Sequence, residues 1–258
     1  MKLQMIAIAS IFSLTCFSQQ DTVATDVYKW KDARPGKEKP GAIRNLVHGS
    51  TLDLADFTIY TITLPRGENK QPAVAYENKE QLIIVKDGTI NLTANDKSNV
   101  MSGGGLALVL AGDRQHISNT SNQPATYYVI SYTGKAPVNM ERGKSGGGSF
   151  MVDWKDMLVK QTEKGQSRPI FDRPSSMFPH FDVHATTLNP GISSHAAHTH
   201  RVEEIILMIR GTGNMQLGNE FKKTTDGDVV FVNSMVPHAI TNIGTEPCSY
   251  FAIQWHTN

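Results

Sequence analysis

The sequence has few cysteines and no long apolar segment. Its two cysteines are Cys16 and Cys248, and Cys16 lies in a leader that we expect to be removed. The one remaining thiol cannot form an internal disulfide, which excludes a disulfide framework. The apolar run from Met5 to Leu14 is well below the ~20 residues that cross a bilayer. We therefore expect no membrane span.

An excess of charge of either sign is also absent. The 25 Lys and Arg residues nearly cancel the 24 Asp and Glu residues, for a formal net charge of +1 at pH 7. No basic stretch is interleaved with aromatic residues, so the electrostatic footprint of a nucleic-acid-binding protein is missing. A small-molecule substrate is the partner that fits this composition, and a homodimer is left open.

Residues 1–18 have the pattern of a signal peptide. A basic start at Lys2 precedes the short apolar run, and small residues surround a cleavage point after Ser18. We therefore expect a periplasmic or secreted protein. Cys16 raises a lipoprotein alternative, but Ser13 stands three residues before it, where a lipobox usually has Leu.

Short apolar stretches bounded by Gly, Asn, Asp and Pro recur along the chain. Those of the first half are Phe57–Leu64, Gln81–Val85, Leu106–Leu110 and Tyr127–Tyr132. Those of the second half are Phe181–Leu188, Glu204–Ile209, Asp228–Val232 and Tyr250–Trp255. This rhythm is typical of all-β sandwiches and barrels. We predict two domains, at residues 24–140 and 168–258.

The predicted linker spans residues 141–167. Its glycine run within Lys144–Ser149 favours a flexible connection. Behind Asp153 as a candidate N-cap, Trp154, Met157 and Leu158 recur at helical spacing, which predicts one short helix across the junction.

The two halves resemble versions of one unit. Aligning Gln81–Gly88 with Glu204–Gly211 places apolar on apolar and glycine on glycine. The separation of Gly105 and His116 equals that of Gly227 and His238. An internal repeat follows from these matches.

Four side chains of metal-ligand type have a suggestive spacing: His198, His200, Glu204 and His238. In an extended strand alternate side chains share a face, so the first three point the same way. The fourth follows a strand and a turn. A single histidine is more often solvated or hydrogen-bonded, but these four together predict a mononuclear metal site.

Three imidazoles and one carboxylate suit Mn, Fe, Ni, Co, Cu or Zn, whereas Ca and Mg prefer oxygen ligands. The predicted cofactor is therefore one divalent transition metal, with its identity left open. Four protein ligands leave two positions of an octahedral ion open, as a site that binds substrate requires.

These segments resemble the motifs of the cupin superfamily. Gly191–Gly211 is similar to the first motif, with glycine, His-x-His, three residues, Glu, six residues and glycine. Gly227–Asn242 is similar to the second. The resemblance implies two tandem cupin barrels, also called jelly rolls or double-stranded β-helices. It also implies that the four side chains bind a metal in the C-terminal barrel.

Two departures from the motifs stand out. Asn233 and Met235 replace the usual proline and glycine of the second motif, which puts the shape of that turn in question. The spacing from Gly191 to His198 is one residue longer than the commonest form.

Carried to the first repeat, the ligand positions fall on Ala75, Glu77, Gln81 and His116. His116 alone is a strong ligand, so the resemblance implies a degenerate N-terminal barrel that packs against the other and completes its pocket. A weak ion on Glu77, Glu80 and His116 is the alternative.

Among the nearby residues, His195 is the catalytic candidate. A loop histidine beside a metal can act as general acid or base, although a surface histidine is the alternative. We expect His180 and His184 to support the site from behind its ligands or to be structural, and not to bind the metal. The opposite strand parity of Glu203 predicts that it turns out of the barrel.

The remaining polar candidates are weaker. Arg210 lies six residues beyond Glu204, about 20 Å along an extended strand at about 3.3 Å per residue, and so falls outside the site. Either Gln254 or Trp255 lines the pocket. We expect Arg168 and Arg173 to be solvated.

The leading hypothesis is an exported metal-dependent enzyme for a small carboxylate- or hydroxyl-bearing molecule, such as a sugar acid. By family resemblance the reaction would be that of a dioxygenase, decarboxylase, oxidase or isomerase. A non-enzymatic binding cupin is the alternative. Bicupin ureidoglycine aminohydrolases are a further one, although they carry Glu-x-His-x-x-x-His with a Gln instead of the order found here.

Overall fold

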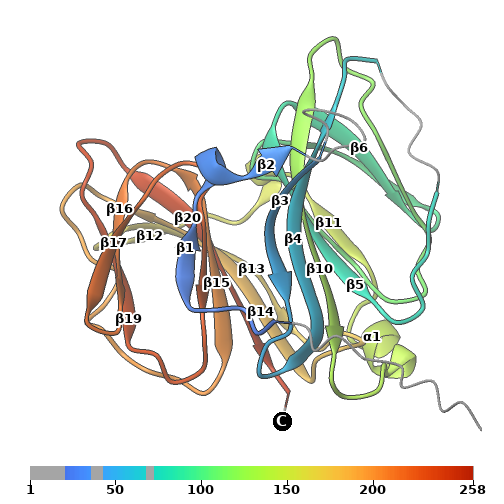
Figure 1. Ribbon diagram of the computed structural model, residues 1–258. Coiled ribbons are helices and arrows are strands. Elements are labelled where there is room, and N and C mark those ends of the chain that lie inside the picture. Colours follow the sequence, from blue (N-terminus) through green and yellow to red (C-terminus); the bar gives the residue numbers. More distant parts are fainter. Residues whose placement is uncertain (1–20, 36–42, 68–72, 258) are drawn as a thin grey trace, which may run out of the picture.

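The computed structural model describes residues 21–35, 43–67 and 73–257. Regular structure in these ranges is almost entirely antiparallel β, arranged as two seven-stranded and two three-stranded sheets. The described part has one α-helix, α1 (Met140–Ser145). Figure 1 shows the two β units side by side. The predicted all-β class is confirmed.

The first unit is a seven-stranded sheet of order β11-β8-β5-β10-β4-β3-β2 and a three-stranded sheet of order β7-β6-β9. Apolar side chains of both sheets, among them Ile83, Leu92 and Ile117, form one core inside the unit. Its strands are β2 (Arg34–Pro35), β3 (Ile43–Gly49), β4 (Leu54–Leu64), β5 (Glu80–Asp87), β6 (Thr89–Ala94), β7 (Lys97–Ser102), β8 (Leu106–Val109), β9 (Gln115–Ser118), β10 (Ala125–Gly134) and β11 (Phe150–Val152).

The second unit repeats this plan with orders β1-β18-β15-β20-β14-β13-β12 and β17-β16-β19. Ile206, Met215 and Ile240 belong to its inner core. Its strands are β1 (Asp26–Tyr28), β12 (Lys160–Thr162), β13 (Gly165–Arg173), β14 (His180–Leu188), β15 (Glu203–Arg210), β16 (Gly213–Leu217), β17 (Glu220–Thr224), β18 (Val229–Val232), β19 (His238–Asn242) and β20 (Cys248–His256).

The strand that precedes each repeat along the chain pairs with the unit formed by the other repeat. β1 pairs with β18 of the C-terminal unit, and β11 pairs with β8 of the N-terminal unit. Both strands lead into a Trp-Lys-Asp 3-10 turn, η1 (Trp30–Asp32) or η2 (Trp154–Asp156). The prediction that residues 24–140 all belong to the N-terminal barrel is therefore wrong for β1. The crossing strand satisfies backbone groups that the edge of β18 would otherwise expose.

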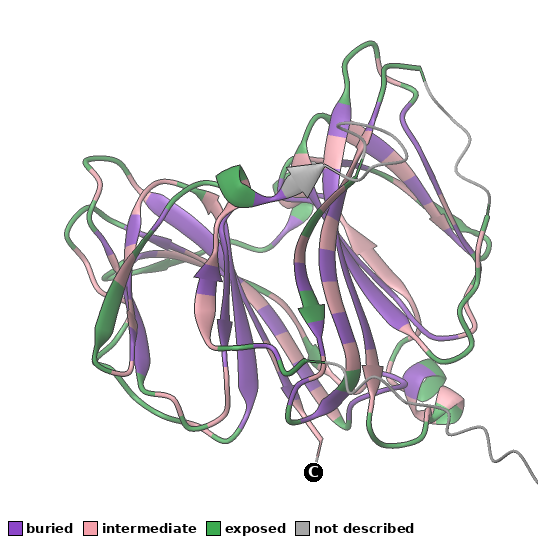
Figure 2. Cartoon of the chain, viewed as in Figure 1, coloured by how far each residue is buried: buried purple, intermediate pink, exposed green. Residues whose placement is uncertain are grey.

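The two large sheets pack against each other through a third apolar core. Phe57 of β4 contacts Phe231 of β18 and Trp255 of β20, with ring centroids 5.4 and 6.2 Å apart. β5 and β15 each bury six consecutive residues because both of their faces are covered. Figure 2 shows this burial along the large sheets. The metal-ligand candidates therefore belong to a unit that is fixed to its neighbour by a continuous core.

The linker differs from the prediction. The stretch from Trp154 is a 3-10 turn, and the α-helix lies earlier, where the side chain of Asn139 accepts a hydrogen bond from the Arg142 amide at its N-cap. The glycine run is anchored as well, since Arg173 donates to the carbonyls of Gly146 (2.7 Å) and Gly148 (2.8 Å). Arg173 is therefore engaged with protein groups and is not the solvated side chain that we predicted.

The described ranges contain no helix that is long and apolar enough to cross a membrane. The predicted signal peptide at residues 1–18 lies outside the described residues.

Candidate metal centre

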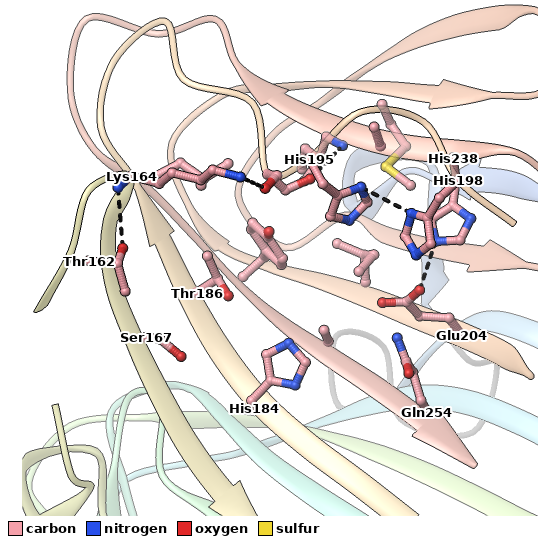
Figure 3. A pocket seen from close by; sticks show the side chains of 18 of the residues that line it. Thr162, Lys164, Ser167, His184, Thr186, His195, His198, Glu204, His238 and Gln254 are labelled. Atoms are coloured by element: carbon pink, nitrogen blue, oxygen red, sulfur yellow. Dashed lines mark hydrogen bonds and ion pairs between the residues drawn. The ribbon is translucent and has the colours of Figure 1, made fainter. Parts of the chain in front are cut away.

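The second unit contains a cavity of about 410 Å³ between its two sheets. His195, His198, His238 and Glu204 gather at one end, and Lys164 and Thr162 lie at the other (Figure 3). The cavity is thus closed at one end by three of the four predicted metal-ligand residues together with His195, and bordered at the other by the β12–β13 hairpin.

Backbone pairing brings His198 and His238 together from separate segments. The amide of His238 donates to the carbonyl of His198 (3.1 Å), and the amide of His198 donates back (3.3 Å). The amide of Met235 donates to the carbonyl of His200 (2.8 Å). Met235 adopts a positive φ of 64°, a backbone conformation that glycine adopts without strain.

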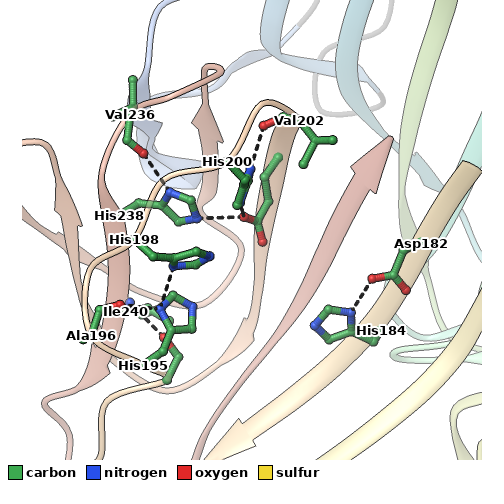
Figure 4. Close-up of polar contacts among 12 residues, drawn as sticks. Asp182, His184, His195, Ala196, His198, His200, Val202, Val236, His238 and Ile240 are labelled. Carbon is green, nitrogen blue, oxygen red and sulfur yellow. Dashed lines mark hydrogen bonds and ion pairs between the residues drawn. The ribbon is translucent and has the colours of Figure 1, made fainter. Parts of the chain in front are cut away.

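The three histidines form one cluster. Their nitrogen atoms lie within 4.8 Å of one another in a geometry that could hold a metal ion. Glu204 Oε2 lies 2.9 Å from His238 Nε2 and 3.2 Å from His200 Nε2. Figure 4 shows these contacts. All four residues singled out from the sequence therefore lie together.

The outer ring nitrogens are already engaged. His200 Nδ1 contacts the carbonyl of Val202 and His238 Nδ1 contacts that of Val236, both at 2.9 Å. A carbonyl only accepts, so both Nδ1 atoms carry the hydrogen and each Nε2 of a neutral ring presents a lone pair. Such contacts orient metal-ligating histidines.

Those nitrogens face a carboxylate, and a cation between them would satisfy both. Burial opposes the charge of Glu204, but its contacts with the His200 and His238 rings outweigh burial and lower the pKa of this carboxyl to about 2. The pKa of His198 is lowered by burial and by its neighbours His195 and His238. An ionised carboxylate and inward-facing imidazole nitrogens form a donor set that fits a divalent transition metal.

His195 lies beside this cluster. Its ring centroid is 4.2 Å from that of His198, and the two Nδ1 atoms are 3.1 Å apart. His195 is exposed and lines the cavity, as a residue that meets a bound molecule would.

His184 lines the same cavity from β14. Its Nδ1 contacts Asp182 Oδ2 at 3.2 Å, which raises the pKa of His184. Figure 4 shows Asp182 behind the ring. This position agrees with the expectation that His184 supports the site and is not one of the clustered ligand candidates. His180 fits the structural part of that expectation, because its ring stacks on that of His256 (centroids 4.3 Å apart).

The strand residues near the cluster differ in whether their side chains face the cavity. Glu203 is fully buried and accepts from Thr51 Oγ1 (2.6 Å), outside the barrel interior as predicted. On β20 Gln254 lines the cavity, whereas Trp255 is buried in the core between the sheets. Arg210 lies with Arg168 at a separate pocket, away from the histidines. The Arg168 guanidinium covers the Trp154 ring at 4.2 Å, so Arg168 is not simply solvated as predicted.

Several lining residues were not singled out from the sequence. Thr162, Lys164, Gln166 and Ser167 come from the β12–β13 hairpin, and Tyr250 comes from β20. Lys164 Nζ donates to the carbonyl of Ser194 at the cavity mouth. Alternation along β20 could have indicated Tyr250, but nothing local marks the hairpin as a cavity wall.

The N-terminal barrel has no such cluster at the equivalent place among the described residues. Gln115, and not His116, exchanges backbone hydrogen bonds with Val74, as His238 does with His198. The assignment of His116 to this position was therefore wrong by one residue. The carbonyl of Tyr76 accepts from Gly112 as that of His200 accepts from Met235, so Val74 and Tyr76, and not Ala75 and Glu77, replace the histidines.

Gln81 does occupy the place of Glu204. It lies opposite Val109, as Glu204 lies opposite Val232. Its Oε1 accepts from Gln115 Nε2, so an amide pair stands where the C-terminal barrel has a carboxylate and an imidazole. These neutral side chains are poor ligands for a transition metal.

Comparison with known proteins supports the fold. Residues 184–254 match the cupin domain family, and no curated protein matches the chain in sequence. A putative glyoxylate-induced protein from Pseudomonas aeruginosa has a similar structure, with a TM-score of 0.67 and 18% identity over 84% of this chain and 81% of that one.

Two oxalate decarboxylases are also similar in structure. That of Lactobacillus farciminis, in a formate complex, has a TM-score of 0.67 and 15% identity over 92% of this chain and 88% of its own. A variant of the Bacillus subtilis enzyme OxdC has a TM-score of 0.68 and 13% identity over 93% of this chain and 80% of its own. Sequence identities as low as these support a shared fold and nothing beyond it.

Proposed function

Because the C-terminal barrel is a cupin domain within a bicupin fold, we propose that the protein is a metal-dependent enzyme. Its substrate would be a small carboxylate- or hydroxyl-bearing molecule such as a sugar acid. The ligands of its single ion would be His198, His200, Glu204 and His238. The observation that carries the proposal is the cavity of about 410 Å³ bordered by three of them, His198, Glu204 and His238, because ligand sites typically measure ≈ 300–1,000 Å³.

The charges around the cavity favour an acidic ligand. Glu204 is the only acidic residue in its lining, and two imidazoles engage that carboxylate. Lys164 lies at the far end, and His184 is held by Asp182 between the two ends. A carboxylate would find cationic or hydrogen-bonding partners at each of these places.

The rest of the lining supports a ligand with a carbon skeleton. Both sheets contribute apolar side chains to it: Leu188, Ile206 and Ala252 from the seven-stranded sheet, and Met215 and Ile240 from the three-stranded sheet. A molecule with polar ends and a short carbon chain matches such a lining, whereas a large flat ligand would exceed the volume.

A divalent transition metal bound by the four residues would supply a Lewis acid for an oxygen donor of the substrate. The protein itself orients the imidazoles through the carbonyls of Val202 and Val236. Gln254 lines the same cavity and helps to lower the pKa of the Glu204 carboxyl. His195 reaches the cavity beside the cluster and is the residue proposed to exchange a proton with a bound molecule.

We further propose that residues 1–18 direct export, so that the mature enzyme acts in the periplasm or outside the cell. The support is the basic start, short apolar run and small residues of the leader.

The test is turnover by purified protein loaded separately with Mn, Fe, Ni, Co, Cu or Zn. The panel comprises sugar acids, phenolics and dicarboxylates, including oxalate because two similar structures are oxalate decarboxylases. NMR of the mixtures should show a product that disappears with Glu204→Gln. Tight ligand binding without turnover would favour the non-enzymatic alternative, and failure to bind any metal would refute the proposal.

A further inference from the structure

A turn of the N-terminal half, Thr51–Asp53, contacts the segment that carries the proposed ligands. Asp53 is 6% exposed and accepts two hydrogen bonds from Arg201, from Nη2 to Oδ1 (2.8 Å) and from Nη1 to Oδ2 (3.1 Å). Arg201 directly follows His200. The turn, hereafter the 51–53 turn, therefore holds one side of the ligand segment by a bidentate ion pair.

Glu203 holds the other side. Its Oε2 accepts from Thr51 Oγ1 (2.6 Å) and the Asp53 amide (3.2 Å), and its Oε1 accepts from the Leu52 amide (2.9 Å). Glu203 directly precedes Glu204. Adjacent side chains of a strand point to opposite faces, so Glu203 faces the 51–53 turn while Glu204 faces the metal site. The contacts of Glu203 therefore anchor the backbone that carries the Glu204 carboxylate.

Packing alone does not hold the segment between these contacts. A second cavity of about 240 Å³ borders it and is lined by residues that include His200, Arg201, Val202 and Asp53. Space on this side would allow His200 to shift if the polar contacts were absent. The ion pair and the Glu203 contacts are therefore placed to set its position.

We propose that the 51–53 turn is a positioning element for the metal centre. By holding Arg201 and Glu203, it sets the spacing of His200 and Glu204 and raises the affinity of the site for a divalent metal. The inference rests on the proposed metal site and gives the N-terminal barrel a defined part in it.

The repeat provides a matched control. Glu80 precedes Gln81 as Glu203 precedes Glu204. It is fully buried and accepts from the Ser176 amide (2.6 Å) and the Tyr132 hydroxyl (3.2 Å). Glu80 thus makes the same kind of contact between the halves on the side without a metal-ligand cluster.

The experiment measures zinc affinity by competition with a chromogenic chelator, alongside urea unfolding of the metal-free protein. Asp53→Asn, Arg201→Gln and Glu203→Gln should each weaken zinc binding by about 10-fold or more, within the ~10–100-fold typical of such supporting contacts. Arg201→Lys keeps the charge without the bidentate fork and should give an intermediate affinity. Glu80→Gln should lower stability and leave zinc affinity at the wild-type value.

Equal zinc affinity in wild type, Asp53→Asn and Arg201→Gln would overturn the inference. So would a loss in Glu80→Gln as large as that in Glu203→Gln, because general loosening would then explain both. Arg201 is half-exposed and its variant tests the same contact if Asp53→Asn does not fold. Wild-type protein that binds no zinc or other divalent metal would instead refute the metal site itself, and this inference with it.

Discussion

The backbone of Met235 is left-handed, and its amide holds the carbonyl of His200 at 2.8 Å. In the first repeat the same contact joins Gly112, at a φ of 82°, to the carbonyl of Tyr76 (2.9 Å). The turn therefore requires a left-handed residue in both halves. A side chain there costs roughly 1–2 kcal/mol, so Met235 is strained beside the metal-ligand cluster.

Met235→Gly should relieve this strain. We expect the free energy of unfolding to rise by up to about 1 kcal/mol, since glycine accepts positive φ but loses more entropy on folding. Metal affinity should not change. Urea unfolding of metal-free protein and a zinc titration check both points.

Met235→Val is the opposing variant, because a β-branched residue is a genuine outlier at positive φ. It should be less stable than wild type by about 1 kcal/mol or more, and it should bind metal more weakly through displacement of His200. Equal stability of the two variants would show that this turn relaxes without cost.

The stoichiometry of metal binding should be one ion per chain. Gln81 and Gln115 occupy the places of Glu204 and His238, and neutral amides do not replace a carboxylate and an imidazole. Metal analysis of loaded protein measures this ratio. His116→Ala should leave it unchanged, and a second ion that this variant loses would show that the N-terminal barrel has a site of its own.

The all-β class and part of the cluster could be predicted from local periodicity. Alternation in an extended chain places His198 and His200 on one face, and the apolar stretches have the length of strands. The two-barrel arrangement and the place of His238 beside the other three were expected from the resemblance to the cupin motifs, since local periodicity does not relate separate segments.

Other features could not be predicted because they depend on pairing over long separations. His116 was placed inside the N-terminal barrel from equal glycine spacing, and a shift of one residue moves a side chain to the opposite face. The pairing of β1 could not be predicted either, because the sequence of β1 does not indicate that β18 is its neighbour. Lys164 comes from a hairpin that carries no signal of its own.

Stability should depend on pH through His184. In metal-free protein the hydrogen bond that His184 donates to Asp182 raises the pKa of His184 above its ordinary value, although burial opposes it. The folded state then binds this proton more tightly than the unfolded state. The contribution of this proton to the free energy of unfolding is fully present below the pKa that His184 has in the unfolded chain. It is lost as pH rises through the higher pKa that His184 has in the folded protein.

Comparison with His184→Gln isolates this contribution, because other groups, including Asp182 and Glu204, titrate in both proteins. The stability of wild type relative to the variant should fall as pH rises above about 6.5, the ordinary pKa of a histidine. Urea unfolding over a series of pH values measures it. A difference that grows with pH would have the wrong sign and would show that His184 is neutral in the folded protein.

The leader should be absent from the mature protein. N-terminal sequencing of protein recovered from the periplasm or medium of the native host should begin at or near Gln19. A chain that keeps Met1 there would contradict export through a signal peptide. A lipid on Cys16 would instead support the lipoprotein alternative.

His238 is the most demanding test of the metal centre, because it reaches the cluster from a different segment of the chain. Its Nε2 contacts Glu204 and its Nδ1 contacts the carbonyl of Val236. His238→Ala should therefore reduce metal affinity by more than the ~10–100-fold that supporting contacts typically provide.

The fold should survive this change, because three apolar cores hold the two barrels without help from a metal. Stability should fall mainly through the loss of stabilisation by bound metal, which thermal unfolding with and without zinc measures. His195→Ala is the matched control, since His195 is exposed and touches His198 from the cavity side. It should keep its metal and lose turnover, because its proposed partner is the bound molecule. If His238→Ala keeps full occupancy while His195→Ala empties the site, His195 takes the place of His238 in the ligand set and the proposed centre is wrong.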